Sequence, residues 1–207
     1  MPTHDDDTRT ARVGELDLAY DTFGDPSDPT VLLVMGLSTQ MIAWPDPFCE
    51  DLAAAGLHVV RFDNRDIGMS THLDTPPPSL PAMLARRGTP YTISDMAGDA
   101  VGLLDVLDVE RAHVVGVSMG GFISQAIAVE HPGRVASLGL LMTSTGSRRV
   151  GRPSPAVMRT FLNRKPVTTE EEAVEGAVAT YRLIGSPDLD EDMVREMACR
   201  SFARGHD

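Results

Sequence analysis

A serine at position 118 lies in the segment Gly116-Val-Ser-Met-Gly120, which matches the pattern G-x-S-x-G. A serine in this pattern can be a nucleophile, whose hydroxyl oxygen attacks a carbonyl carbon while a histidine accepts its proton. Because the two glycines lack a Cβ atom, the flanking backbones can approach closely and hold the serine in an unfavourable turn. The pattern arises easily by chance in a chain with 18 glycines. The segments around it therefore decide its meaning.

Those segments predict a strand before Ser118 and a helix after it. Residues 112–117 form a short apolar run, and residues 120–130 form an amphipathic helical pattern. A serine between two such elements is raised above the carboxyl end of a sheet. There the free N–H groups and the positive end of the helix dipole can stabilise a negative charge. We therefore predict that Ser118 is a catalytic nucleophile.

Two other turns could carry this sequence, a dinucleotide-binding turn and a tight turn without chemistry. The dinucleotide turn requires glycine at position 118 and an acidic residue about twenty positions further on. Neither is present, because no Asp or Glu occurs between His131 and Thr169. The nucleophile is the stronger interpretation.

The first 146 residues alternate short apolar runs with helical patterns. The predicted strands are 13–23 (a strand or a hairpin), 30–35, 57–62, 112–117 and 135–142. The predicted helices are 48–55, a second that Ser94 caps and that runs to about Leu107, and 120–130. Fully apolar runs are typical of strands buried on both faces of a parallel sheet. We predict an α/β core with a doubly wound, mostly parallel sheet at residues 1–146.

Residues 147–207 contain no further strand pattern and predict a helical cap over the ligand-binding edge of the sheet. Helices are expected to start at Ser154, Thr169 and Asp190, the last ending at Gly205. Apolar side chains at helical spacing would form the core of this cap, with the alternative that some line an apolar substrate pocket. They are Met158, Phe161, Leu162, Tyr181, Met193, Met197 and Phe202.

The composition excludes several classes of protein. The chain has 207 residues with 18 basic and 30 acidic side chains, a net charge of −12 that disfavours nucleic acid as a partner. No run of eighteen apolar residues occurs and the N-terminus is acidic, so we expect a cytoplasmic protein without a membrane partner. Cys49 and Cys199 lie far apart, which predicts neither a disulfide nor a metal site. No cofactor is expected.

Taken together, these motifs resemble the α/β-hydrolase superfamily, and most of all its branch of anthracycline methyl esterases and related small-ester hydrolases. The resemblance rests on Val34-Met-Gly-Leu37, Trp44-Pro45, Phe62 to Ser70, the segment around Ser118, and His131 to Val135. It implies the strand order 1-2-4-3-5-6-7-8. It also implies that the backbone N–H groups of Leu37 and Met119 form the oxyanion hole. Backbone donors suit this role because they cannot ionise and need no reorganisation during the reaction.

Residues 63–70 resemble the family's D-x-R-G-x-G-x-S loop, with Asp66 where a glycine is usual. We interpret this loop as braced by a buried Asp–Arg pair. An acid role for Asp63 or Asp66 in catalysis is the alternative.

The family's mechanism also needs an acid after strand six or seven and a histidine after strand eight. The sixth strand is followed by Thr143-Ser-Thr-Gly146, which supplies no acid. His206-Asp207 superficially copies the family's histidine motif, but no strand precedes it. We therefore expect the acid and the histidine within about 70 to 100 residues beyond residue 207, so that the chain is an incomplete hydrolase.

The leading hypothesis is a serine hydrolase acting on a small, apolar carboxylic ester through Ser118, Leu37 and Met119. A cofactor-free haloperoxidase or perhydrolase of the same fold is the alternative, and a non-catalytic fragment or binding module is another. The uncharged run 135–142 would be an unprotected sheet edge if no further strand pairs with it, so self-association through this strand is expected.

Overall fold

The computed structural model describes residues 8–74, 89–147, 151, 154–162 and 167–205. Its contacts divide the chain into two compact units, Met1–Ser144 and Thr145–Asp207. Ser118, Leu37 and Met119 all belong to the first unit.

The first unit is built on a six-stranded mixed sheet with the order β1-β2-β4-β3-β5-β6. The strands are β1 (Arg9–Val13), β2 (Leu16–Phe23), β3 (Thr30–Val34), β4 (His58–Phe62), β5 (Ala112–Val117) and β6 (Val135–Leu141). The β1–β2 hairpin is antiparallel, whereas β4, β3, β5 and β6 run parallel to one another. The α/β fold and the expected order of these strands are confirmed. The parallel strands end at a common edge of the sheet, where Leu37 and Ser118 follow β3 and β5.

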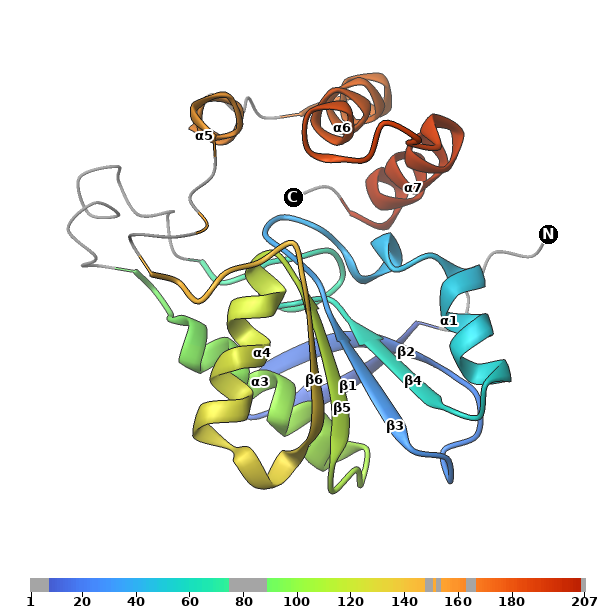
Figure 1. The fold of residues 1–207 in the computed structure, drawn as a ribbon, viewed down its shortest axis with the longest axis vertical. Coiled ribbons are helices and arrows are strands. Elements are labelled where there is room, and N and C mark those ends of the chain that lie inside the picture. Colours follow the sequence, from blue (N-terminus) through green and yellow to red (C-terminus); the bar gives the residue numbers. More distant parts are fainter. Residues whose placement is uncertain (1–7, 75–88, 148–150, 152–153, 163–166, 206–207) are drawn as a thin grey trace. The chain divides into compact units, whose positions relative to one another are not determined.

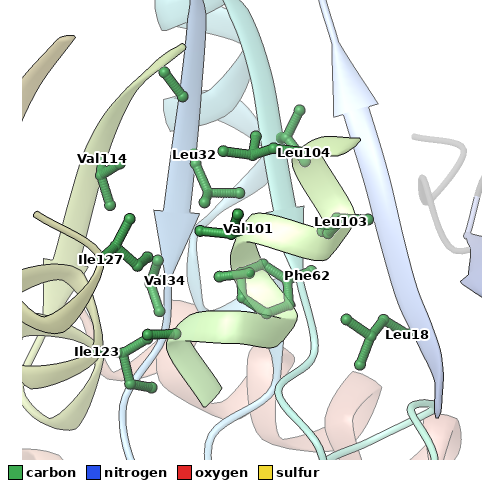
Figure 2. Close-up of a cluster of buried hydrophobic side chains, with 14 of the residues drawn as sticks. Leu18, Leu32, Val34, Phe62, Val101, Leu103, Leu104, Val114, Ile123 and Ile127 are labelled. Carbon is green, nitrogen blue, oxygen red and sulfur yellow. The ribbon is translucent and has the colours of Figure 1, made fainter. Parts of the chain in front are cut away.

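Helices cover both faces of this sheet (Figure 1). Helices α3 (Ile93–Val106) and α4 (Met119–Glu130) lie on one face, and α1 (Asp46–Ala54) lies on the other. Figure 2 shows the core between the sheet and α3 and α4, where Leu32 and Phe62 meet Ile123 and Leu104 without exposed surface. A smaller cluster around Trp44 and Cys49 fills the other face. Apolar packing on both faces thus holds the sheet whose strands lead to Leu37 and Ser118.

Helix α3 begins two residues earlier than expected. Its N-cap is Thr92, whose hydroxyl accepts the N–H of Asp95 while the Asp95 carboxylate accepts the N–H of Thr92. This reciprocal capping box satisfies two free donors of the first turn. Ser94, the cap expected from the sequence, donates its hydroxyl to Glu130 of α4 instead.

The second unit contains the three helices expected from the sequence, α5 (Pro155–Leu162), α6 (Glu170–Ile184) and α7 (Glu191–Arg204). Thr169 and Asp190 cap α6 and α7 through side-chain oxygens, as predicted. Between these helices Val178, Val194 and Ala198 are buried, and the Tyr181 hydroxyl lies 3.8 Å from the Met197 sulfur.

The apolar side chains predicted for this unit have different environments. Tyr181 and Met197 contribute to the packing of α6 on α7, whereas Met193 is 47% exposed. The side chains of Met158, Phe161 and Leu162 lie outside the described residues. In the described part of the chain, no helix is long and apolar enough to cross a membrane.

Candidate active site

Ser118 lies at the sharp turn between β5 and α4, with φ 54° and ψ −117°. A positive φ is uncommon for any residue other than glycine, so surrounding contacts must hold it. The Ser118 N–H donates to the Leu141 carbonyl at 3.0 Å, and the Ser118 carbonyl accepts the Gly121 N–H at 3.1 Å. The same carbonyl accepts the Thr143 hydroxyl at 2.8 Å. These bonds fix the backbone on both sides of the exposed Ser118 side chain.

The glycines of the motif stand where three elements approach closely. A Cβ atom on Gly116 would lie 2.3 Å from both the Gly120 carbonyl oxygen and the Ser124 hydroxyl oxygen. A Cβ atom on Gly120 would lie 2.2 Å from the Val34 carbonyl oxygen at the end of β3. Only glycine fits at these positions without displacing backbone, as expected from the sequence.

The turn after β3 lies beside the serine. A Cβ atom on Gly36 would lie 3.3 Å from the Ser118 Cβ and 3.8 Å from its hydroxyl oxygen. The next residue, Leu37, is 53% exposed. Met119 is the first residue of α4, where an N–H group has no acceptor within the helix. The fold thus brings Leu37, Ser118 and Met119 to one place. The role of Ser118 as nucleophile and those of Leu37 and Met119 as oxyanion donors stay predictions.

The loop after β4 is braced by an Asp–Arg pair, as expected, and by a second set of contacts at Asp63. Asp63 is fully buried, and its carboxylate accepts the backbone N–H groups of Met41 at 2.7 Å and Met69 at 3.1 Å. The ion pair of this loop joins Arg65 to Asp99 of α3 at 2.6 Å. The expected bracing by an Asp–Arg pair is therefore present, but it leaves out Asp63.

Asp66 occupies the glycine position of the loop with φ 63°. Aspartate tolerates the left-handed conformation better than most residues because its short side chain can hydrogen-bond locally. Here the Asp66 carboxylate accepts the Leu73 N–H at 2.6 Å. This contact gives Asp66 a structural role at the position where the family has glycine.

Sequence reasoning missed a buried ionic network at Arg61 in β4. Arg61 has no exposed surface and pairs with Asp21 of β2 at 2.8 Å and with Asp46 of α1 at 2.6 Å. Desolvation disfavours its charge, yet the hydrogen bond and charge of Asp21 hold the pKa of Arg61 above its usual range. The detectable signal was an arginine inside an apolar run, because buried arginine requires partners. The Trp44 carbonyl also accepts a hydrogen bond from Arg61. Because Trp44 lies in the segment that follows the turn at Leu37, this bond links the network to that segment.

Neither free cysteine is suited to act as the nucleophile. Burial raises the pKa of the Cys49 thiol to about 12. Burial also raises the pKa of Cys199. The thiolate is the reactive form, so both residues are poorly activated at neutral pH.

No histidine among the described residues hydrogen-bonds the Ser118 hydroxyl. The described histidines have other partners or positions: His58 contacts Thr30, His72 contacts the Gly68 carbonyl, His113 contacts Ser137, and His131 ends α4. Burial lowers the pKa of His58, which starts β4 at the edge opposite Ser118. His206 and Asp207 lie outside the described residues. Within the described part, no three His, Cys, Asp or Glu side chains gather as a metal site would require.

Comparison with known proteins decides the family. Residues 29–183 match the family model described as the alpha/beta hydrolase fold. The chain belongs to this α/β-hydrolase family. The elements of this hydrolase that carry Leu37, Ser118 and Met119 all fall inside the matched region.

The similar proteins include esterases. The hydrolase is 34% identical over 221 aligned residues to the rhodomycin D methylesterase DauP of Streptomyces sp. (strain C5). The alignment covers 96% of this chain and 69% of DauP. It is 33% identical over 128 residues to BpoC of Mycobacterium tuberculosis (strain ATCC 25618 / H37Rv), provisionally named a non-heme bromoperoxidase. That match covers 62% of this chain and 42% of BpoC.

Solved structures share the fold. A membrane phospholipase A described as a bacterial virulence factor superposes with a TM-score of 0.67 at 23% identity, over 95% of this chain. The hydrolase spans 58% of the length of that protein. The methylesterase similarity supports the ester-hydrolase interpretation over the haloperoxidase alternative, because it extends over nearly the whole chain.

Proposed function

We propose that this protein is a serine hydrolase that cleaves a carboxylic ester through Ser118. The observation that carries the proposal is the backbone of Ser118, held at φ 54° between β5 and α4 with Gly36 beside its hydroxyl. A strained serine at a helix N-terminus is suited to nucleophilic attack, because backbone N–H groups at such a turn can stabilise the oxyanion.

In the proposed reaction the Ser118 oxygen attacks the ester carbonyl carbon. The carbonyl oxygen becomes an oxyanion that accepts hydrogen bonds from the N–H groups of Leu37 and Met119. The alcohol leaves, and water then hydrolyses the acyl-enzyme. A histidine must take the serine proton and pass it to the leaving alcohol, and an acid must orient that histidine. We assign neither role to a described residue.

The proposed substrate is a small, apolar molecule that carries a methyl ester. The similarity to a methylesterase supports the leaving group. The exposed apolar side chain of Leu37, next to Gly36 and Ser118, supports an apolar substrate. Peroxide-dependent halogenation is the second candidate, favoured by the shorter match to BpoC.

The test is Ser118→Ala in the full-length protein. Hydrolysis of a chromogenic methyl or short-chain ester should fall by about 10⁴-fold or more, because residues of a catalytic triad act as a unit. The matched control is Ser124→Ala in α4, the helix that follows Ser118. The Ser124 hydroxyl donates to the Gly120 carbonyl at 2.8 Å. The control should keep its turnover per folded molecule.

Two outcomes would contradict the proposal. Ester hydrolysis that survives Ser118→Ala would remove Ser118 from the reaction. Bromination with peroxide that is much faster than ester hydrolysis, and that is lost in Ser118→Ala, would favour the haloperoxidase alternative.

We also propose that the chain self-associates through β6, which would pair with a second copy of the chain. Within the described residues β6 pairs only with β5, and Leu138, Leu140 and Leu141 are each at least 38% exposed. Unpaired N–H and C=O groups beside apolar side chains are a template for another strand. The cytoplasmic location stays a prediction from the sequence.

A further inference from the structure

Two adjacent buried side chains hold the ends of the turn that carries Leu37. The Asn64 side-chain amide donates to the Met35 carbonyl at 3.1 Å, just before the turn. The Asp63 carboxylate accepts the Met41 N–H at 2.7 Å, just after it. Both side chains are almost inaccessible, with 0% exposure for Asp63 and 2% for Asn64. The turn at residues 36–40 is therefore held at both of its ends by hydrogen bonds with the loop after β4.

The loop that supplies these contacts is itself anchored. The second carboxylate oxygen of Asp63 accepts the Met69 N–H at 3.1 Å. The Ser70 hydroxyl donates to the Asp63 carbonyl at 2.6 Å and accepts the Ala19 N–H of β2 at 2.9 Å. The clamp formed by Asp63 and Asn64 is thus fixed to the sheet at a second point.

The middle of the turn at residues 36–40 has an exposed side chain and a strained backbone. Leu37 is 53% exposed, and Ser38 has φ 49°, a conformation that costs energy for a serine. The Thr39 hydroxyl donates to the Leu37 carbonyl at 3.0 Å, a bond inside the turn that cannot orient the turn toward Ser118. The contacts at the two ends of the turn therefore contribute to the orientation of the Leu37 N–H.

We propose that Asp63 and Asn64 are positioning residues for the oxyanion hole, acting through the Leu37 N–H. This inference rests on the proposed function. An oxyanion donor lowers the barrier only when it already points to where the charge develops, and a displacement of about 1 Å can cost about 100-fold in rate. Neither side chain touches the substrate. Their loss should reduce kcat and leave substrate binding largely unchanged.

The first variant is Asn64→Asp, which keeps the shape but places an acceptor against the Met35 carbonyl. We expect kcat for ester hydrolysis to fall about 10- to 100-fold, with KM within about threefold. The second variant is Asp63→Asn, which keeps one acceptor oxygen for two N–H donors and should lose less activity than Asp63→Ala. The matched control is Asp99→Asn, which breaks the 2.6 Å Arg65 pair of the same loop without reaching the turn. It should keep kcat.

A second measurement does not depend on turnover. Hydrogen exchange of a peptide covering residues 36–41 should accelerate in Asn64→Asp and Asp63→Asn. Exchange of residues 117–121 should match the unmodified protein. Asp99→Asn should leave exchange of residues 36–41 unchanged.

The outcomes separate the two proposals. Unchanged exchange at residues 36–41 in both clamp variants, or an equal loss of kcat in Asp99→Asn, would overturn the positioning role. Activity that survives Ser118→Ala would overturn the proposed function instead, while the exchange data would still report whether the clamp orders the turn.

Discussion

The two flanks of Ser118 are built in opposite ways. On the side of β3 and β4, the polar groups of Asp63 and Asn64 are buried and hydrogen-bonded. On the side of β6, apolar side chains such as Leu140 are exposed along an edge strand. The first flank holds its geometry with its own contacts. Among the described residues, the second flank has one strand neighbour for β6 and exposed apolar surface on it.

The largest expected loss of stability is at Asp21, in the buried ionic network around Arg61. Asp21→Ala removes a partner of the fully buried Arg61 and should lower the free energy of unfolding by about 3 kcal/mol or more. Urea denaturation would measure it. Asp17→Ala in the same strand is the control, because its pair with Arg12 is more than half exposed on both sides and should cost less than about 1 kcal/mol. Equal losses in the two variants would contradict the contrast between buried and exposed pairs.

An intermediate effect is expected at Gly120, in the first turn of α4, next to the turn that carries Ser118. Gly120→Ala places a Cβ atom 2.2 Å from the Val34 carbonyl oxygen, so the free energy of unfolding should fall by about 1–3 kcal/mol. The control is Gly98→Ala in α3, where no atom lies within 4 Å of the new Cβ. That change should stabilise the protein by about 0.4–1 kcal/mol. The midpoint of thermal unfolding should therefore fall in Gly120→Ala and rise in Gly98→Ala.

The smallest effect on stability is expected at the open flank. Leu140→Lys on β6 should change the free energy of unfolding by no more than about 0.5 kcal/mol, since Leu140 is 42% exposed. It should, however, reduce concentration-dependent association measured by sedimentation, because a charge on an edge opposes strand pairing. Val129→Lys on α4, at an 80% exposed position, is the control and should not alter association. A strictly monomeric unmodified chain would refute pairing through β6.

Much of the fold could be predicted from the sequence because its signals are local. The apolar run 112–117 and the glycines around Ser118 specify a strand, a turn and a helix within a few residues of one another. The caps at Thr169 and Asp190 follow from side chains that reach only three residues ahead. The N-cap of α3 was misplaced although Thr92 and Asp95 carry the capping-box spacing, because Ser94 is an equally good capping residue by type.

The contacts that cross the sheet were not predictable in the same way. Arg61 meets Asp21 because β2 and β4 are neighbours with Asp21 opposite Arg61, a register that no local pattern contains. Asn64 reaches Met35 because β3 and β4 are adjacent and end together. The sequence marks both residues as polar groups next to apolar runs, but their partners depend on strand order.

The hydrogen bond from the Ser118 N–H to the Leu141 carbonyl ties the proposed nucleophile to the edge strand. Edge strands with exposed side chains open locally at a lower free energy than the centre of a sheet. Each opening of β6 frees this N–H, and the Thr143 contact to the Ser118 carbonyl can be lost with it. In the proposed mechanism, only molecules in which β6 is closed hold Ser118 in the geometry described above, so the rate per molecule scales with the fraction of closed molecules. A strand that pairs with the outer side of β6 would therefore act on turnover from a distance, by raising the population of competent molecules without touching the substrate.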